Sequence, residues 1–229
     1  MSKAGSLDTV NSMNGHTVKE EIANAITHGI GAVLSVVALV ALVVYSAEGA
    51  DPYRIVGVSI FGATMLLMYC ASTLYHAFPH PNIKHVMRIC DHCSIYLLIA
   101  GTYTPICLVS MRGPWGWTML AILWGIALFG CIFKLFFVGR CEKFSVGLYV
   151  AMGWMAVIAI KPTLEMVPGP AMIMMALGGL TYTSGVIFYL WDRLPYNHAI
   201  WHLFVLGGST MHFLAIFWWV LPVPVEGAV

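Results

Sequence analysis

Residues 22–46 of the chain read IANAITHGIGAVLSVVALVALVVYS and contain no Asp, Glu, Lys or Arg. A helix of about 20 predominantly apolar residues is long enough to cross the hydrocarbon core of a bilayer, so this stretch predicts a transmembrane helix. Residues 1–21 before it are polar and contain no apolar run. The stretch therefore begins too late, and runs too long, for a cleavable signal peptide.

The composition of the whole chain agrees with a membrane protein. Of its 229 residues, 60% are hydrophobic and only 9% are charged, and the mean hydropathy is +0.84. A soluble domain carries about 25% charged residues, because its surface faces water. The net charge of +1 argues against nucleic acid as a partner. We therefore expect an integral membrane protein whose partners are membrane lipids.

Seven segments are long and apolar enough to be transmembrane helices, and short connections rich in Gly and Pro separate them. The segments are Ile22–Ser46, Ile55–Phe78, Arg88–Val109, Trp117–Phe137, Ser145–Ile160, Ala171–Leu190 and His198–Leu221. The expected fold is therefore all-α, a seven-transmembrane helix bundle over residues 22–221. A short polar tail (residues 1–21) precedes it, and a short tail (residues 222–229) follows it.

The orientation of the bundle follows from the Lys and Arg residues of its short loops, which are enriched on the cytoplasmic side. One side would carry Lys3, Lys19, Lys84, Arg88, Lys134, Arg140, Lys143 and Arg193. The other side would carry Arg54, Arg112 and Lys161. This bias predicts a cytoplasmic N-terminus and, with seven spans, a C-terminus outside the cytoplasm.

Ionisable side chains occur inside the expected spans at His28, His76, Asp91, His198 and His202. Such groups are costly in the bilayer, so each is a candidate functional residue. In the predicted orientation, all of them fall in the cytoplasmic half of their helices. Residues far apart in the sequence therefore share one depth, as a single site requires.

The spacing of these residues favours a zinc site. His198 and His202 are related as i and i+4, which places both imidazoles on one helix face. With His76 they would supply three nitrogen ligands and leave the fourth tetrahedral position for water, the arrangement typical of catalytic zinc. Asp91 is then a candidate general base, and Ser72, one turn before His76, a candidate to orient the water or stabilise an oxyanion. The alternative is that these groups only bond between helices or relay protons.

The remaining histidines are not expected in this site. His80 and His85 lie in a proline-broken loop and are expected to be solvated. His212 follows His202 by ten residues, which places it roughly 15 Å farther along the helix, too far to share the same ion.

Four motifs resemble those of the haemolysin III family, and they occur in the family's order. They are EIANAITH (residues 21–28), STLYH (72–76), DH (91–92) with the following YTP (103–105), and NHAIWH (197–202). The resemblance extends from Glu20 to Leu221. This family is the bacterial branch related to the progestin and adiponectin receptors, within a superfamily that includes the alkaline ceramidases.

The resemblance implies zinc ligands at His76, His198 and His202, with Asp91 and Ser72 beside the metal. We add His28 as a candidate outer residue of the same site. The family's fold is a seven-helix bundle with a cytoplasmic N-terminus, and its bacterial members lie in the inner membrane. The relation to ceramidases implies a metal-dependent hydrolase acting on a lipid amide. The short N-terminal tail gives no reason to expect a protein hormone as a ligand.

Three functions follow from these patterns. The first is a zinc-dependent hydrolase of a lipid amide or ester. The second is a sensor of lipid or membrane state, in which zinc is structural and the protein contributes to membrane homeostasis. The third is a cytolytic protein, as the family name suggests. The open fourth zinc position beside a carboxylate favours the first.

Overall fold

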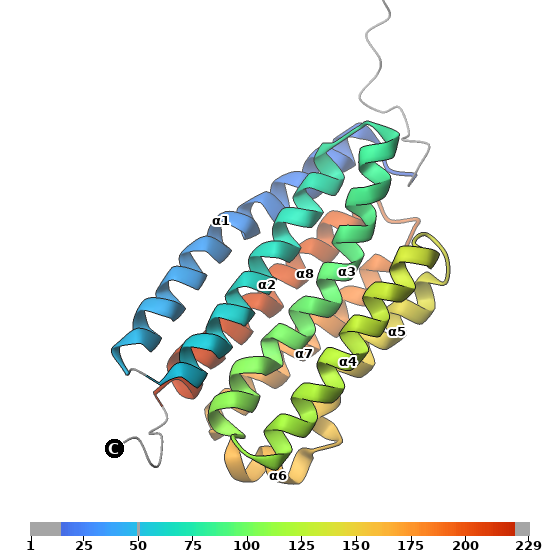
Figure 1. The fold of residues 1–229 in the computed structure, drawn as a ribbon. Helices are drawn as coiled ribbons and strands as arrows, with labels where there is room; N and C mark the ends of the chain where they lie inside the picture. Colours follow the sequence, from blue (N-terminus) through green and yellow to red (C-terminus); the bar gives the residue numbers. More distant parts are fainter. Residues whose placement is uncertain (1–14, 50, 223–229) are drawn as a thin grey trace, which may run out of the picture.

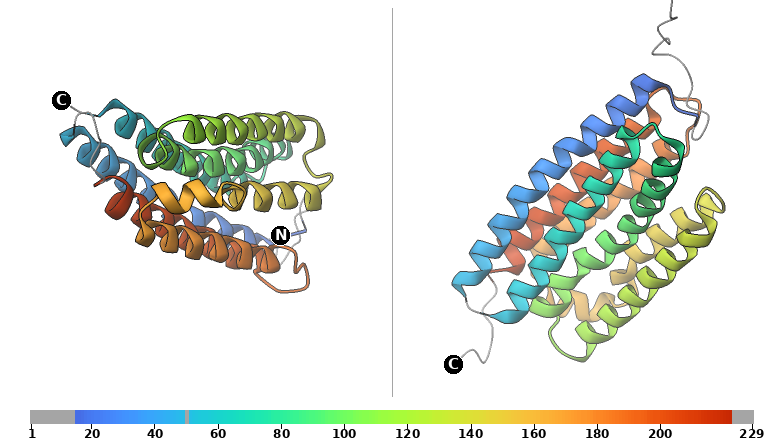
Figure 2. Two further views of the ribbon diagram at one scale, coloured as in Figure 1. Left: turned by 90° about the horizontal axis from the view of Figure 1, so that it is seen from below. Right: turned by 45° about the horizontal axis from the view of Figure 1, so that its top comes forward.

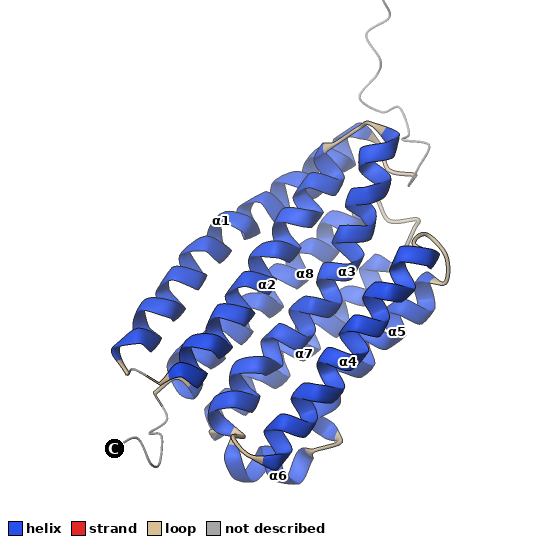
Figure 3. Ribbon diagram, viewed as in Figure 1, coloured by secondary structure: helices blue, strands red, loops and turns tan. Residues whose placement is uncertain are grey.

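The computed structural model describes residues 15–49 and 51–222, and every regular element in this part of the chain is a helix (Figures 1 and 3). In chain order they are α1 (Val18–Glu48), α2 (Pro52–Ala77), α3 (Pro81–Pro105), a π-helical turn (Ile106–Ser110), α4 (Pro114–Phe137), α5 (Glu142–Gly153), a 3-10 turn (Met155–Val157), α6 (Ile160–Met166), α7 (Gly169–Tyr189), α8 (Asn197–Ala215) and a second π-helical turn (Ile216–Val220).

The starts of these helices have local causes in the sequence. Thr17 and Glu20 form a capping box at the start of α1, and the Asp51 side chain accepts a hydrogen bond from the first turn of α2. Helices α2, α3, α4 and α7 each have proline in the first turn, where its missing N–H costs nothing. The breaker-rich connections therefore mark the helix boundaries well.

Within the described residues, six helices are long and apolar enough to cross a membrane. They are α1, α2, α3 with its π-helical turn, α4, α7, and α8 with its π-helical turn. Their outer faces are apolar, as lipid contact requires: Val33 on α1 is 68% exposed and Phe136 on α4 is 74% exposed. An all-helical, multi-pass membrane fold is thus confirmed.

The fifth expected span, Ser145–Ile160, is not one continuous helix. Helix α5 ends at Gly153, a residue that disfavours helix. The freed backbone groups are satisfied by a side chain, because the Tyr103 hydroxyl donates to the Gly153 carbonyl (2.6 Å) and accepts from the Ala156 N–H (3.2 Å). Broken helices are tolerated at membrane depth when such partners exist.

The broken segment still passes along the bundle. Figure 1 shows α5 starting near the end of α4 and α6 lying at the opposite end of the molecule. Figure 2 shows the same two pieces in line from another direction. The predicted seven-span topology would therefore need a crossing made in pieces rather than by one helix, and this topology and its orientation stay predictions.

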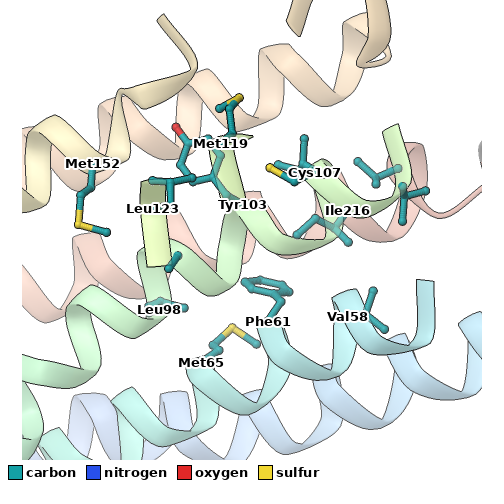
Figure 4. Close-up of a cluster of buried hydrophobic side chains, with 14 of the residues drawn as sticks. Val58, Phe61, Met65, Leu98, Tyr103, Cys107, Met119, Leu123, Met152 and Ile216 are labelled. Atoms are coloured by element: carbon teal, nitrogen blue, oxygen red, sulfur yellow. The ribbon is translucent and has the colours of Figure 1, made fainter. Parts of the chain in front are cut away.

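The packing of the helices brings three helix starts to one end of the bundle. Helix α8 packs against α1 and α7, and α3 packs against α2 and α4. Figure 1 shows α1, α3 and α8 beginning at the same end, where α2 finishes; we call this the site end. The apolar core lies between α2, α3 and α4, where Phe61, Met65 and Leu98 are buried (Figure 4).

Fusion reporters test the predicted topology. An enzyme that is active only outside the cytoplasm should be active when fused after Val229 and inactive when fused before Met1, because Lys and Arg concentrate in cytoplasmic loops. A fusion in the loop at Asn82 should behave like the N-terminal one. A reporter that fluoresces only in the cytoplasm is the control and should give the opposite pattern. Equal activity at both ends would mean an even number of crossings.

Candidate metal centre

Three histidines meet at the site end of the bundle. His76 comes from the last turn of α2, and His198 and His202 come from the first turns of α8. One nitrogen from each lies within 4.8 Å of the others. The ring centroids are 5.0 Å apart for His76 and His198, and 4.6 Å apart for His198 and His202. The residues expected to bind a metal are therefore close enough to share one.

His76 is oriented by an acidic residue of α1. Its Nδ1 lies 2.7 Å from Oε2 of Glu21. Nζ of Lys84 lies 3.0 Å from Oε1 of Glu21 and balances the charge of that carboxylate. Among the residues that the structure describes, His76 Nε2 is buried and has no hydrogen-bond partner. A histidine that donates one N–H to a carboxylate and leaves its other nitrogen unpaired is the typical arrangement of a metal ligand. The site thus fits a metal ion.

His202 is also held through Nδ1. That atom lies 3.2 Å from the backbone oxygen of Asn24 and 3.0 Å from Oγ1 of Thr27. The Thr27 hydroxyl donates to backbone carbonyls of its own helix, so it accepts from the imidazole. A proton on Nδ1 leaves the lone pair on Nε2, as in His76. Both histidines are therefore positioned by the first turns of α1.

The sequence interpretation missed the orienting role of α1. It considered Glu21, Asn24 and Thr27 only as parts of a family motif. The available signal was their spacing: polar residues at positions 21, 24, 27 and 28 form one face of an otherwise apolar helix. A polar face on a membrane helix indicates contact with other polar groups in the bundle.

Asp91 and Ser72 are not part of the three-nitrogen group. Both are buried and line the same cavity as His198 and His202. Within the described residues, the buried Ser72 hydroxyl has no hydrogen-bond partner. This arrangement leaves the carboxyl and the hydroxyl available to a molecule in the cavity.

His28 packs on a metal-ligand candidate rather than bonding to it. Its ring stacks on His202 with centroids 3.4 Å apart, and it meets the Tyr69 ring edge-on at 5.0 Å. Tyr69 can approach α1 because Gly31 has no side chain, since a Cβ there would collide with the tyrosine ring. Within the described ranges, neither nitrogen of His28 has a hydrogen-bond partner.

His16 is a further residue that the sequence interpretation did not include. It precedes α1, and its ring centroid lies 5.3 Å from that of His198. His16, Glu21 and His76 form a second group with ligand atoms within 4.8 Å of one another. Burial lowers the pKa of His16, although the Glu21 carboxylate opposes the shift. His16 therefore favours the neutral form at the outer edge of the site.

His198 and His202 line a cavity of about 580 Å³ that runs between α3, α5, α6, α7 and α8. This volume is within the range of small-molecule sites. Its polar groups at the site end include Ser72, Asp91, His198 and His202, whereas its far end is lined by Met111, Met119 and other apolar side chains. The cavity is suited to a molecule with a polar head and a long apolar chain.

Replacing Glu21 by glutamine should weaken zinc binding about 10–100-fold, the usual effect of losing a residue that orients a metal ligand. The amide keeps the shape but loses the charge that favours a proton on Nδ1 of His76. Competition with a zinc chelator measures the change. Glu20→Gln is the matched control, because Glu20 bonds to Thr17 and to the N–H of Tyr196 rather than to a histidine. Equal zinc affinities of the two variants would contradict the role of Glu21.

Known proteins share this chain's sequence over most of its length. The family model described as "Haemolysin-III related" matches residues 16–213. "Hemolysin-3" of Bacillus cereus is 51% identical over 205 residues, which cover 90% of this chain and 94% of that protein. The "Hemolysin-3 homolog" of Bacillus subtilis is 48% identical over 208 residues, covering 91% and 98%. A human relative, "Monocyte to macrophage differentiation factor", is 27% identical over 216 residues, covering 92% and 88%. The chain belongs to the haemolysin III family.

Proposed function

We propose that this protein is a zinc-dependent hydrolase that cleaves the amide or ester bond of a lipid. Its site would face the cytoplasm from within the bacterial inner membrane. The observation that carries the proposal is the placement of the histidines. Three ligand nitrogens lie within 4.8 Å of one another, and two of their histidines, His198 and His202, line a largely apolar cavity that is also lined by a buried carboxyl group, that of Asp91.

His76, His198 and His202 would hold the zinc ion. When bound there, zinc would polarise a carbonyl group and make water more acidic. Two observations support this ligand set: His76 Nε2 has no hydrogen-bond partner among the described residues, and Nδ1 of both His76 and His202 is held by α1. Three protein ligands are the number found in catalytic zinc sites, whereas structural sites use four.

Asp91 would act as the general base and Ser72 as a hydrogen-bond donor. Asp91 accepts a proton as the oxygen of water attacks the lipid carbonyl carbon, and it returns that proton to the leaving nitrogen or oxygen when the bond breaks. Ser72 donates to the carbonyl oxygen, on which negative charge develops. The cavity holds the acyl chain and so fixes the carbonyl group near both residues.

A lipid panel tests the proposed reaction. Zinc-loaded protein in detergent should release fatty acid from at least one lipid class, detected by mass spectrometry, and a chelator should stop the release. Restoring zinc should restore it. If fully zinc-loaded protein releases no fatty acid from amides and esters of several headgroup classes, the hydrolase proposal is wrong.

One feature of the fold favours the sensor as a second candidate function. The break between α5 and α6, with Trp154 and Val157, lines the cavity, as do Val150 of α5 and Ile160 of α6. A lipid in the cavity would therefore contact a segment held by side-chain hydrogen bonds rather than by a continuous helix. Lipid-dependent hydrogen exchange at residues 153–160, in protein that retains zinc but hydrolyses nothing, would favour this function.

A further inference from the structure

A second polar cluster lies outside the metal centre, between α2, α7 and α8. We define the mid-cavity cluster as Tyr69, Tyr182, Ser209 and His212. The Tyr69 hydroxyl donates to Ser209 Oγ at 2.9 Å, and the Tyr182 hydroxyl lies 2.6 Å from the same oxygen. The rings of Tyr182 and His212 are 5.5 Å apart, and both residues line the cavity.

This cluster lies deep in the membrane. Helix α8 runs without a break from His202 to His212, so the rise along it is roughly 15 Å. The hydrocarbon core is about 30 Å thick, which places the cluster near its middle when the metal centre lies near one surface. Polar groups at this depth are costly and are therefore candidates for function.

His212 has an unused hydrogen-bond acceptor. Its Nε2 lies 3.2 Å from the backbone oxygen of Met175, which can only accept, so Nε2 carries the proton. The Nε2–Cδ2 edge faces Gly178 on α7, where a Cβ would collide with it. Nδ1 is therefore on the opposite side of the ring, and no described residue makes a hydrogen bond to it.

The hydroxyl groups of the cluster also have an unused donor. Tyr69, Tyr182 and Ser209 each carry one O–H proton, and two hydrogen bonds join them in the part of the chain that the structure describes. One proton is left over. When Ser209 donates to Tyr182, the Tyr182 hydroxyl keeps its own proton for a molecule in the cavity, which Tyr182 and His212 both line.

We propose that the mid-cavity cluster binds a hydroxyl group carried partway along the acyl chain of the ligand. The proposal rests on the proposed function only in assuming that the cavity holds a lipid chain with its head at the metal centre. A hydroxyl matches the site because it donates to His212 Nδ1 and accepts from Tyr182. A carbonyl would leave Nδ1 unsatisfied, and an ionised group would be too costly at this depth.

Comparison of two fatty acids tests the proposal by binding alone, so a failed hydrolysis assay does not affect the result. The probes are stearic acid and a hydroxystearic acid whose hydroxyl is in the middle of the chain. Purified zinc-loaded protein should bind the hydroxylated acid about tenfold more tightly, since neutral hydrogen bonds contribute this order of affinity. Displacement of a fluorescent fatty acid measures both affinities.

Two variants should remove the preference, and one should keep it. His212→Leu removes the acceptor and Tyr182→Phe removes the donor, so each should bind the two acids nearly equally. Tyr149→Phe is the matched control. It also removes a tyrosine hydroxyl from the cavity wall, but that hydroxyl already donates to the backbone oxygen of His92.

Thermal melting and zinc content identify any variant that fails to fold. If His212→Leu does not fold, the affinities of Tyr182→Phe for the two acids test the proposal. Three results would overturn the proposal. They are equal affinity of wild type for both acids, a preference that survives in both cluster variants, and no binding of either acid. Equal affinity is also the result expected if the cluster only holds a buried water molecule.

Discussion

Replacing His202 with alanine should leave the purified protein almost free of zinc, whereas the wild type should hold about one zinc ion per chain. The substitution removes one of three nitrogens that lie within 4.8 Å of one another. The loss should exceed the 10–100-fold weakening that follows from removing an orienting residue, because the bond to the metal itself is lost. Elemental analysis of protein purified in trace zinc measures the content.

Two further variants make this result specific. His76→Ala should also strip the metal, because it removes a ligand from a different helix. His212→Ala is the matched control, since it deletes an imidazole from the same helix and the same cavity but at a different depth. Full zinc content in both His202→Ala and His76→Ala would show that the metal centre is assigned to the wrong residues.

Replacing Asp91 with asparagine should abolish lipid hydrolysis while zinc and fold are retained. The two side chains are nearly isosteric, so the buried site keeps its shape, but the amide cannot accept the proton that the carboxylate takes from water. General-base contributions are about 10²–10⁴-fold in rate, and we expect a loss of that size. Fatty-acid release by mass spectrometry, with zinc measured on the same samples, gives both quantities.

His198→Ala is the contrasting variant and should lose zinc and activity together. Asp192→Asn is the matched control, because it makes the same chemical change in the exposed loop before α8 and should hydrolyse lipid at the wild-type rate. Equal turnover by wild type and Asp91→Asn would exclude Asp91 as the base. Loss of zinc from Asp91→Asn would instead make Asp91 part of the metal centre.

Most of the fold could be predicted from the sequence, because membrane helices are long apolar runs between breakers. Six of the seven expected segments correspond to helices long and apolar enough to span. The exception, Ser145–Ile160, is equally apolar, so hydropathy could not distinguish it. Its break depends on hydrogen bonds from Tyr103, about 50 residues earlier in the chain. Sequence periodicity gives no information about partners of this kind.

The candidate site was only partly predictable for a related reason. His76, His198 and His202 could be grouped because their depth follows from topology and their spacing from helix geometry. Glu21 and His16 lie near the polar end of α1, where charged residues are expected without any function. Their importance appears only when α1 is packed against α2 and α8, which brings Glu21 to within 2.7 Å of His76.

The three helices that form the metal centre come from opposite ends of the chain, and this has a consequence for biosynthesis. The groups that orient the histidines belong to α1, and two of the three histidines belong to α8, which is made later. Neither α2 nor α8 alone supplies all three histidines. A nascent chain could therefore not bind zinc in this geometry before α8 has been made and has packed against α1 and α2, and a bound ion would link segments that are synthesised far apart in time.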